Sequence, residues 1–158
     1  MPIHYEQDDE HIVRITIDRP EARNSADMEH FKQLRESWER FDADPDAWVA
    51  VITGVGDAFF TGADLIPAQH AYEMGLLNAI VPREQLLDKA YEYAHRITAN
   101  APLAVQATKQ SVWEGLGMSL RDAYKNESQL SSAIFQTEDA KEGPKAFAEK
   151  RKPNWQGK

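Results

Sequence analysis

The chain has 158 residues, of which 42% are hydrophobic and 28% are charged, and its formal net charge is −8. This composition is typical of one compact globular domain, or one domain with a helical appendage, and it excludes a disordered chain. The net negative charge argues against nucleic acid as a partner, and the absence of cysteine excludes disulfides and thiolate metal sites.

The chain shows no sign of membrane insertion or of metal binding. No run of apolar residues approaches the length that spans a membrane, and the first ten residues lack the apolar core of a signal peptide. No two of the five histidines have the spacing of metal ligands. We therefore expect a cytoplasmic protein with no membrane partner and no metal.

The first half of the chain alternates between extended and helical patterns. Strands are expected at residues 3–6 and 11–18, followed by a helix with Ser25 as its N-cap. The apolar residues of this helix recur at steps of three and four, which predicts one buried stripe made of Met28, Phe31, Leu34, Trp38 and Phe41.

The apolar run at residues 48–52 is rich in β-branched residues and too short for an independent helix. It is typical of a strand buried on both faces, as in a parallel sheet. The order strand, helix, strand favours an α/β arrangement with a crossover helix. After Pro82 the pattern is helical, with Pro102, Ser119 and Thr137 at helix starts and a kink or a new start expected at Pro144.

The turn at residues 61–65 follows the strand expected at residues 48–52. It contains Gly62, which leaves the next backbone N–H groups free to point at a ligand. Such a turn can form half of an anion or oxyanion site. It can equally be an ordinary connection from strand to helix with Asp64 as the N-cap. The residues alone leave both interpretations open.

Five segments of the chain resemble the crotonase, or enoyl-CoA hydratase/isomerase, superfamily in the family's own order. Residues 58–65, AFFTGADL, are similar to its AFxAGxDL segment, and residues 18–24, DRPEARN, to its NRPxAxN loop. Residues 71–82, AYEMGLLNAIVP, are similar to its AxxxGLVNxVVP segment. The remaining matches lie in the C-terminal half, at residues 101–109 and 142–151.

The resemblance implies an α/β fold in which a truncated crotonase-like ββα core, residues 1–81, precedes a C-terminal helical region, residues 82–158. In the family these rear helices pack against neighbouring subunits, usually in trimers, so a homo-oligomer is expected. Between Leu65 and Ile66 the chain passes from the first half of the family's core to its later part. The segment without a counterpart normally supplies the second oxyanion amide and the acid–base carboxylates, and no two of the eight glycines here are adjacent.

The resemblance also implies a binding site for acyl-CoA, with the coenzyme A thioester as substrate and no separate cofactor. The backbone N–H of Ala63 would be the remaining oxyanion donor. Positions that line the family's coenzyme A groove correspond here to Glu21, Ala22, Arg23, Thr61, Ala63, Asp64, Leu65, Phe147 and Lys150. Basic residues near the C-terminus, including Arg151 and Lys152, are expected to hold the phosphates.

His70 and Glu73 follow the break in the family pattern between Leu65 and Ile66 and are one helical turn apart. They could face one ligand or lie together on a solvated helix face. Two functions remain open. The chain could bind acyl-CoA with hydration or isomerisation of an enoyl thioester as its ancestral reaction, or it could be an inactive member that only oligomerises or binds coenzyme A.

Overall fold

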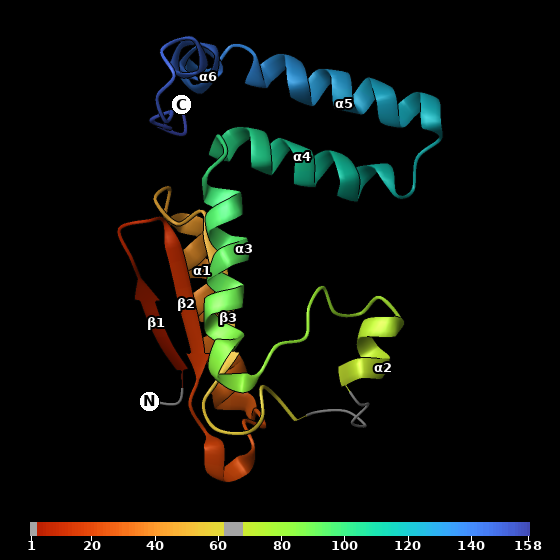
Figure 1. Ribbon diagram of the computed structural model, residues 1–158. Coiled ribbons are helices and arrows are strands. Elements are labelled where there is room, and N and C mark those ends of the chain that lie inside the picture. Colours follow the sequence, from red (N-terminus) through yellow and green to blue (C-terminus); the bar gives the residue numbers. More distant parts are fainter. Residues whose placement is uncertain (1–2, 62–67) are drawn as a thin grey trace. The chain divides into compact units, whose positions relative to one another are not determined.

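A computed structural model describes residues 3–61 and 68–158 (Figure 1). It confirms an α/β fold in which a small sheet is followed by helices. The described elements are β1 (Ile3–Gln7), β2 (Ile12–Ile17), α1 (Met28–Ala43), β3 (Val49–Gly54), α2 (Ala68–Glu73), α3 (Leu86–Thr98), α4 (Pro102–Gly115), α5 (Leu120–Ile134) and α6 (Glu138–Ala148). The chain divides into two compact units, Met1–His95 and Arg96–Lys158.

The sheet of the first unit has the order β1-β2-β3, so β2 lies at its centre. β1 and β2 are antiparallel, with Ile3 opposite Ile17, and the polar turn between them closes the hairpin. β2 and β3 are parallel, with Ile12 opposite Val49. A parallel pair needs a crossover connection, and α1 is that crossover.

β2 contributes side chains to two hydrophobic clusters, one on each face of the sheet. On one face Ile12 packs with Val51 of β3 and Ala94 of α3. On the other face Val13 and Ile15 pack in a cluster that α1 covers with Leu34 and Phe41. Ile12, Val13 and Ile15 are at most 1% exposed, and each contributes about 1.5–3 kcal/mol through burial.

The division between the compact units, after residue 95, differs from the division at residues 81 and 82 expected from the sequence. Leu87, Ala90, Tyr91 and Ala94 of α3 pack against the sheet residues Ile12 and Val51, and this packing joins residues 82–95 to the first unit. The role of the rear helices in oligomerisation stays a prediction.

Two expectations for α1 are wrong. Asp27, not Ser25, is the N-cap, because its carboxylate accepts hydrogen bonds from the backbone N–H groups of Glu29 and His30. The expected stripe is also not the buried face, since Met28 is 84% exposed and Phe31 is 52% exposed. The face turned inward instead carries His30, Leu34, Ser37 and Phe41, which follow the same spacing of three and four.

β3 is also less enclosed than the sequence suggests. Val51 is 8% exposed, whereas Ile52 on the opposite face is 36% exposed. Among the described strands β3 pairs with β2 alone, so it is the outer strand of the sheet. The expectation of a strand buried on both faces is therefore wrong.

The second unit contains α4, α5 and α6 together with the C-terminal tail. α4 begins with Pro102 in its first turn, and the side chains of Ser119 and Thr137 cap α5 and α6, as the sequence indicates. α6 continues through Pro144, so no new helix starts there. α4 and α5 pack against each other (Figure 1).

The tail, residues 152–158, is tied to both ends of the second unit. The carboxylate of Asp139, a residue that is 2% exposed, accepts hydrogen bonds from the backbone N–H groups of Gln156 and Gly157 at 2.7 and 2.9 Å. The indole N–H of Trp155 donates to the carbonyl of Ala99 at 2.9 Å. The tail therefore links α6 to the segment before α4.

Candidate functional site

Two loops of the first unit meet and bring predicted site residues together. The loop at residues 19–24 contains a short 3₁₀ turn, Pro20–Ala22, and ends with Arg23 and Asn24 in left-handed conformations, with φ of 51° and 58°. The second loop follows β3. The hydroxyl of Thr61 donates a hydrogen bond to the carbonyl of Arg23 at 2.9 Å, which joins the two loops.

The cation of Arg23 is available in this site, whereas that of its neighbour Arg19 is engaged. Arg19 donates to the carbonyl of Ser25 at 3.1 Å and lies 3.4 Å from the carboxylate of Asp27. Arg23 is exposed, and no carboxylate among residues 3–61 and 68–158 forms an ion pair with it. An exposed guanidinium without a partner can bind phosphate through two parallel hydrogen bonds.

Glu21 is exposed and Ala22 is half-buried in the same short turn, so both lie at the rim of the two-loop site. Ala63, Asp64 and Leu65 lie outside the described residues. The site therefore consists of residues 21–23 and Thr61 in the part of the chain that the structure describes.

Phe147 and Lys150 lie in the second unit, at the end of α6. Phe147 is 87% exposed, and Lys150 adopts a left-handed conformation with φ of 53° where the helix ends. An exposed aromatic ring near an ammonium group suits a ligand that has both a planar base and phosphates.

Arg151, in contrast, is engaged within the protein. Its guanidinium lies 2.5 and 2.9 Å from the carboxylate oxygens of Glu142 and 2.6 Å from Glu149. The hydrogen bonds from Arg151, and next the N–H of Asn154, lower the pKa of Glu142 to about 2. Arg151 is thus paired with two carboxylates, and its contact with a phosphate stays a prediction.

His70 and Glu73 are both exposed on α2. The carboxylate of Glu73 accepts a hydrogen bond from Gln69 at 2.9 Å. Both side chains thus lie on a solvated helix face, which was one of the two open interpretations. Across the described ranges, no three histidines or carboxylates gather as a metal site would require.

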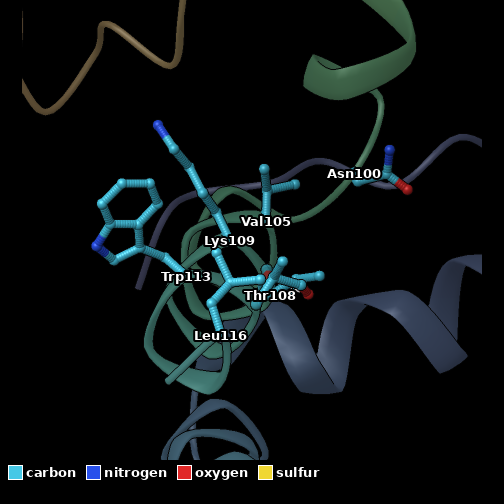
Figure 2. Close-up of a pocket in the computed structure, with 8 residues that line it drawn as sticks. Asn100, Val105, Thr108, Lys109, Trp113 and Leu116 are labelled. Atoms are coloured by element: carbon cyan, nitrogen blue, oxygen red, sulfur yellow. Dashed lines mark hydrogen bonds between the residues drawn. The ribbon is translucent and has the colours of Figure 1, made fainter. Parts of the chain in front are cut away.

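An apolar groove on α4, with a cavity volume of about 610 Å³, was not predicted from the sequence. Figure 2 shows its lining, which includes Val105, Lys109, Trp113 and Leu116. Val112, Trp113 and Leu116 are 64%, 77% and 79% exposed. The signal was present in the sequence as a helical spacing of apolar residues: Val112 and Trp113 precede Leu116 by four and three residues, and Val105 precedes Val112 by seven.

Comparison with known proteins assigns the family. The family model described as "Enoyl-CoA hydratase/isomerase" matches residues 7–67 and 62–158. The chain thus belongs to the enoyl-CoA hydratase/isomerase family, within the crotonase superfamily. The two matched segments overlap at residues 62–67, which include the expected interruption of the family pattern between Leu65 and Ile66.

Individual relatives agree with this assignment. The chain is 27% identical over 250 residues to enoyl-CoA hydratase EchA19 of Mycobacterium tuberculosis, with 94% of each chain covered. It is 39% identical over 107 residues to carnitinyl-CoA dehydratase of Salmonella arizonae, and this match covers 65% of the chain but 41% of that protein. The first alignment is longer than the chain itself, so part of that relative has no counterpart here.

Solved structures resemble the fold over its full length. An enoyl-CoA hydratase from Mycobacterium tuberculosis superposes with a TM-score of 0.93 at 25% identity and covers 99% of both chains. An enoyl-CoA hydratase/isomerase from Mycobacterium paratuberculosis has a TM-score of 0.91 at 26% identity, and covers 100% of this chain and 99% of that one. In the described part of the chain, no helix is long and apolar enough to cross a membrane.

Proposed function

We propose that this chain binds acyl-CoA thioesters, with Arg23 in the first unit and Lys150 in the second unit as two separate candidates for contact with the phosphates of coenzyme A. Three observations support the proposal: the family assignment, the contact between Thr61 and Arg23, and the distribution of charge. Residues 96–158 hold ten of the 18 Lys and Arg residues but only seven of the 26 Asp and Glu residues. The second unit is therefore cationic although the whole chain is anionic, and a cationic surface attracts a polyphosphate.

The observation that carries the proposal is the junction of the two loops at the Thr61–Arg23 hydrogen bond. Thr61 from one loop contacts Arg23 from the other, and Glu21 and Ala22 precede Arg23 in the same short turn. Phe147 and Lys150, at the end of α6 in the second unit, are proposed separately to stack on the adenine and to face a phosphate. Ala63, Asp64 and Leu65 complete the contacts, and the Ala63 N–H donates to the thioester oxygen.

We further propose that catalysis is weak or absent. An enolate oxygen needs preorganised donors, and the loss of one typically costs about two to three powers of ten in rate. Hydration also needs a general base for water and a general acid for the carbon. His70 and Glu73 are exposed on α2, and neither is held by the kind of buried hydrogen-bond network that orients a catalytic group. An inactive coenzyme A-binding module is therefore favoured over an active hydratase or isomerase.

The proposal includes a missing middle segment between Leu65 and Ile66. The meeting of the two family-model segments at residues 62–67 supports it, as does the alignment with EchA19 that exceeds the length of the chain. Sequencing the genomic locus and its transcript tests this part, because an intervening coding segment would contradict it.

The function is tested by titrating coenzyme A into the protein in a calorimeter while assaying the hydration of crotonyl-CoA by absorbance. We expect saturable binding of coenzyme A, and a turnover far below the normal enzyme range of about 1–10³ per second. Turnover near one per second would contradict the inactive module. The absence of binding at millimolar coenzyme A would contradict the binding site itself.

Self-association is the second proposed property, and the apolar groove on α4 supports it. Several large apolar side chains of the rear helices are exposed together, and contiguous apolar patches on soluble proteins mark interaction surfaces. A homo-oligomer formed through these helices would cover them.

A further inference from the structure

The strongest unexplained feature of the first unit is Asn24, a polar residue that is completely buried at the junction of the two loops. Its side-chain carbonyl accepts a hydrogen bond from the N–H of Arg19 at 2.9 Å. Its amide group donates to the carbonyl of Val55 at 2.8 Å and to that of Ala58 at 2.5 Å. Both amide hydrogens of the side chain are therefore used, and both go to the second loop.

The backbone of Asn24 explains why asparagine suits this position. Its φ of 58° is left-handed, a conformation that asparagine tolerates better than most residues. The turn is closed locally, since the N–H of Asn24 donates to the carbonyl of Arg19 at 2.9 Å. The side chain thereby leaves the first loop and points into the second.

Gly54 provides the space in which this side chain lies. A Cβ atom at residue 54 would lie 2.6 Å from the Asn24 amide nitrogen, and 2.5 and 2.7 Å from the carbonyl oxygens of Phe59 and Ala58. Real Cβ atoms do not approach other heavy atoms so closely, so any side chain here would force the two loops apart. Asn24 and Gly54 therefore form one packed junction.

We propose that Asn24 is a positioning residue that holds residues 55–61 against residues 19–23, so that Arg23 and Thr61 present one surface to coenzyme A. This inference rests on the proposed function for its ligand. The inference goes beyond the proposed function because it assigns the arrangement of the two loops to a residue that does not contact the ligand. The hydrogen bond between Thr61 and Arg23 is exposed, whereas Asn24 is completely buried and its two hydrogen bonds to the second loop are partly buried, so their loss costs more.

The substitution Asn24→Asp tests the inference. Aspartate has nearly the same size, tolerates the left-handed conformation and still accepts from Arg19, but it cannot donate to Val55 and Ala58. We expect coenzyme A binding to weaken about tenfold, which corresponds to the typical cost of unsatisfied buried carbonyls. We also expect the amides of residues 55–61 to exchange with deuterium faster, while those of β2 do not change.

Asn100→Asp is the matched control. The amide of Asn100 also donates to two carbonyls, those of Arg96 at 2.7 Å and Ile97 at 3.3 Å, but it lies in the second unit. The control adds the same negative charge to the chain, so it separates the loss of position from a general repulsion of the anionic ligand. It should leave exchange at residues 55–61 as in the parent.

Gly54→Ala provides a second route to the same result, because its Cβ would lie too close to the Asn24 amide and to the carbonyls of Phe59 and Ala58, which separates the two loops although residue 24 is still asparagine. If Asn24→Asp does not fold, Asn24→Gly replaces it, since glycine retains the left-handed backbone without a charge. Unchanged exchange at residues 55–61 in a folded Asn24 variant would overturn the inference. If the parent itself fails to bind coenzyme A, the proposed function fails, and the exchange measurement still decides whether Asn24 positions the loop.

Discussion

Arg151 and Glu142 form a bidentate ion pair in which the two guanidinium nitrogens lie 2.5 and 2.9 Å from the two carboxylate oxygens. Glu142 lies within α6 and Arg151 follows the end of that helix, so the pair holds the beginning of the tail against the helix. The N–H of Asn154 adds a third hydrogen bond to the same carboxylate at 2.8 Å. Arg151 therefore has a structural role, which distinguishes it from its neighbour Lys150 in the same basic cluster.

The first prediction concerns pH. The pKa of Glu142 is lowered from 4.5 to about 2, chiefly by hydrogen bonds from Arg151. A carboxyl whose folded pKa lies below its unfolded value stabilises the protein above the unfolded pKa. This stabilisation should be lost as the pH falls from 4.5 to about 2. Urea unfolding of the parent should show the loss, and Glu142→Gln should lack this part of the pH dependence. Identical pH profiles for both proteins would contradict the prediction.

The second prediction separates Lys150 from Arg151. Lys150→Ala should weaken coenzyme A binding about threefold, because an exposed charge pair contributes below about 1 kcal/mol, and should leave the melting temperature unchanged. Arg151→Ala should lower the melting temperature, because it leaves Glu142 unpaired. Lys125→Ala is the control, since it removes an exposed cation that pairs with Asp122 at 3.5 Å on α5. If Lys125→Ala weakens binding as much as Lys150→Ala, the effect is only one of net charge.

The third prediction concerns self-association through the groove on α4. The parent should sediment as a concentration-dependent oligomer at micromolar protein, and Trp113→Ser should shift it toward monomer, since this ring is 77% exposed. Met28→Ser is the matched control, because Met28 is 84% exposed but lies on α1. A stable monomer of the parent at these concentrations would contradict the proposal.

The fourth prediction concerns the core at β2. Ile15 is completely buried against α1, so Ile15→Ala should lower the free energy of unfolding by about 2–5 kcal/mol. Ile52→Ala, on the outer strand, removes the same atoms from a side chain that is 36% exposed and should cost less. Urea unfolding of the two variants measures the difference. Equal losses would show that the outer strand is buried by something beyond the described residues.

β2 and the starts of two helices were predictable, because each depends on a local sequence pattern. The alternation around Val13 and Ile15 predicted β2, and the hydroxyls of Ser119 and Thr137 predicted two helix starts. The inner face of α1 was not predictable from spacing, because Leu34 and Phe41 belong to two stripes with the same period. Tertiary packing selected the stripe that contains His30 and Ser37.

The candidate site was predictable only in part, because its residues come from distant loops. The family motifs indicated residues 21–23 and Thr61, and the structure brings these together. No sequence signal identified the hydrogen bonds from Asn24 to Val55 and Ala58, since they span more than thirty residues of chain. The pairing of Arg151 with Glu142, nine residues apart, was missed for a different reason, since the partner lies across a helix end.

The crossover between β2 and β3 has a consequence for the order of folding. These strands pair only after residues 18–48 have closed into a loop, whereas the short segment 116–119 already holds α4 beside α5. Contacts between residues near in sequence form faster than distant strand pairings. Synthesis proceeds in the opposite order, because the ribosome releases the sheet residues first. The slow-folding part of this chain therefore leaves the ribosome first, and its strands β2 and β3 are unpaired with each other until the crossover has closed.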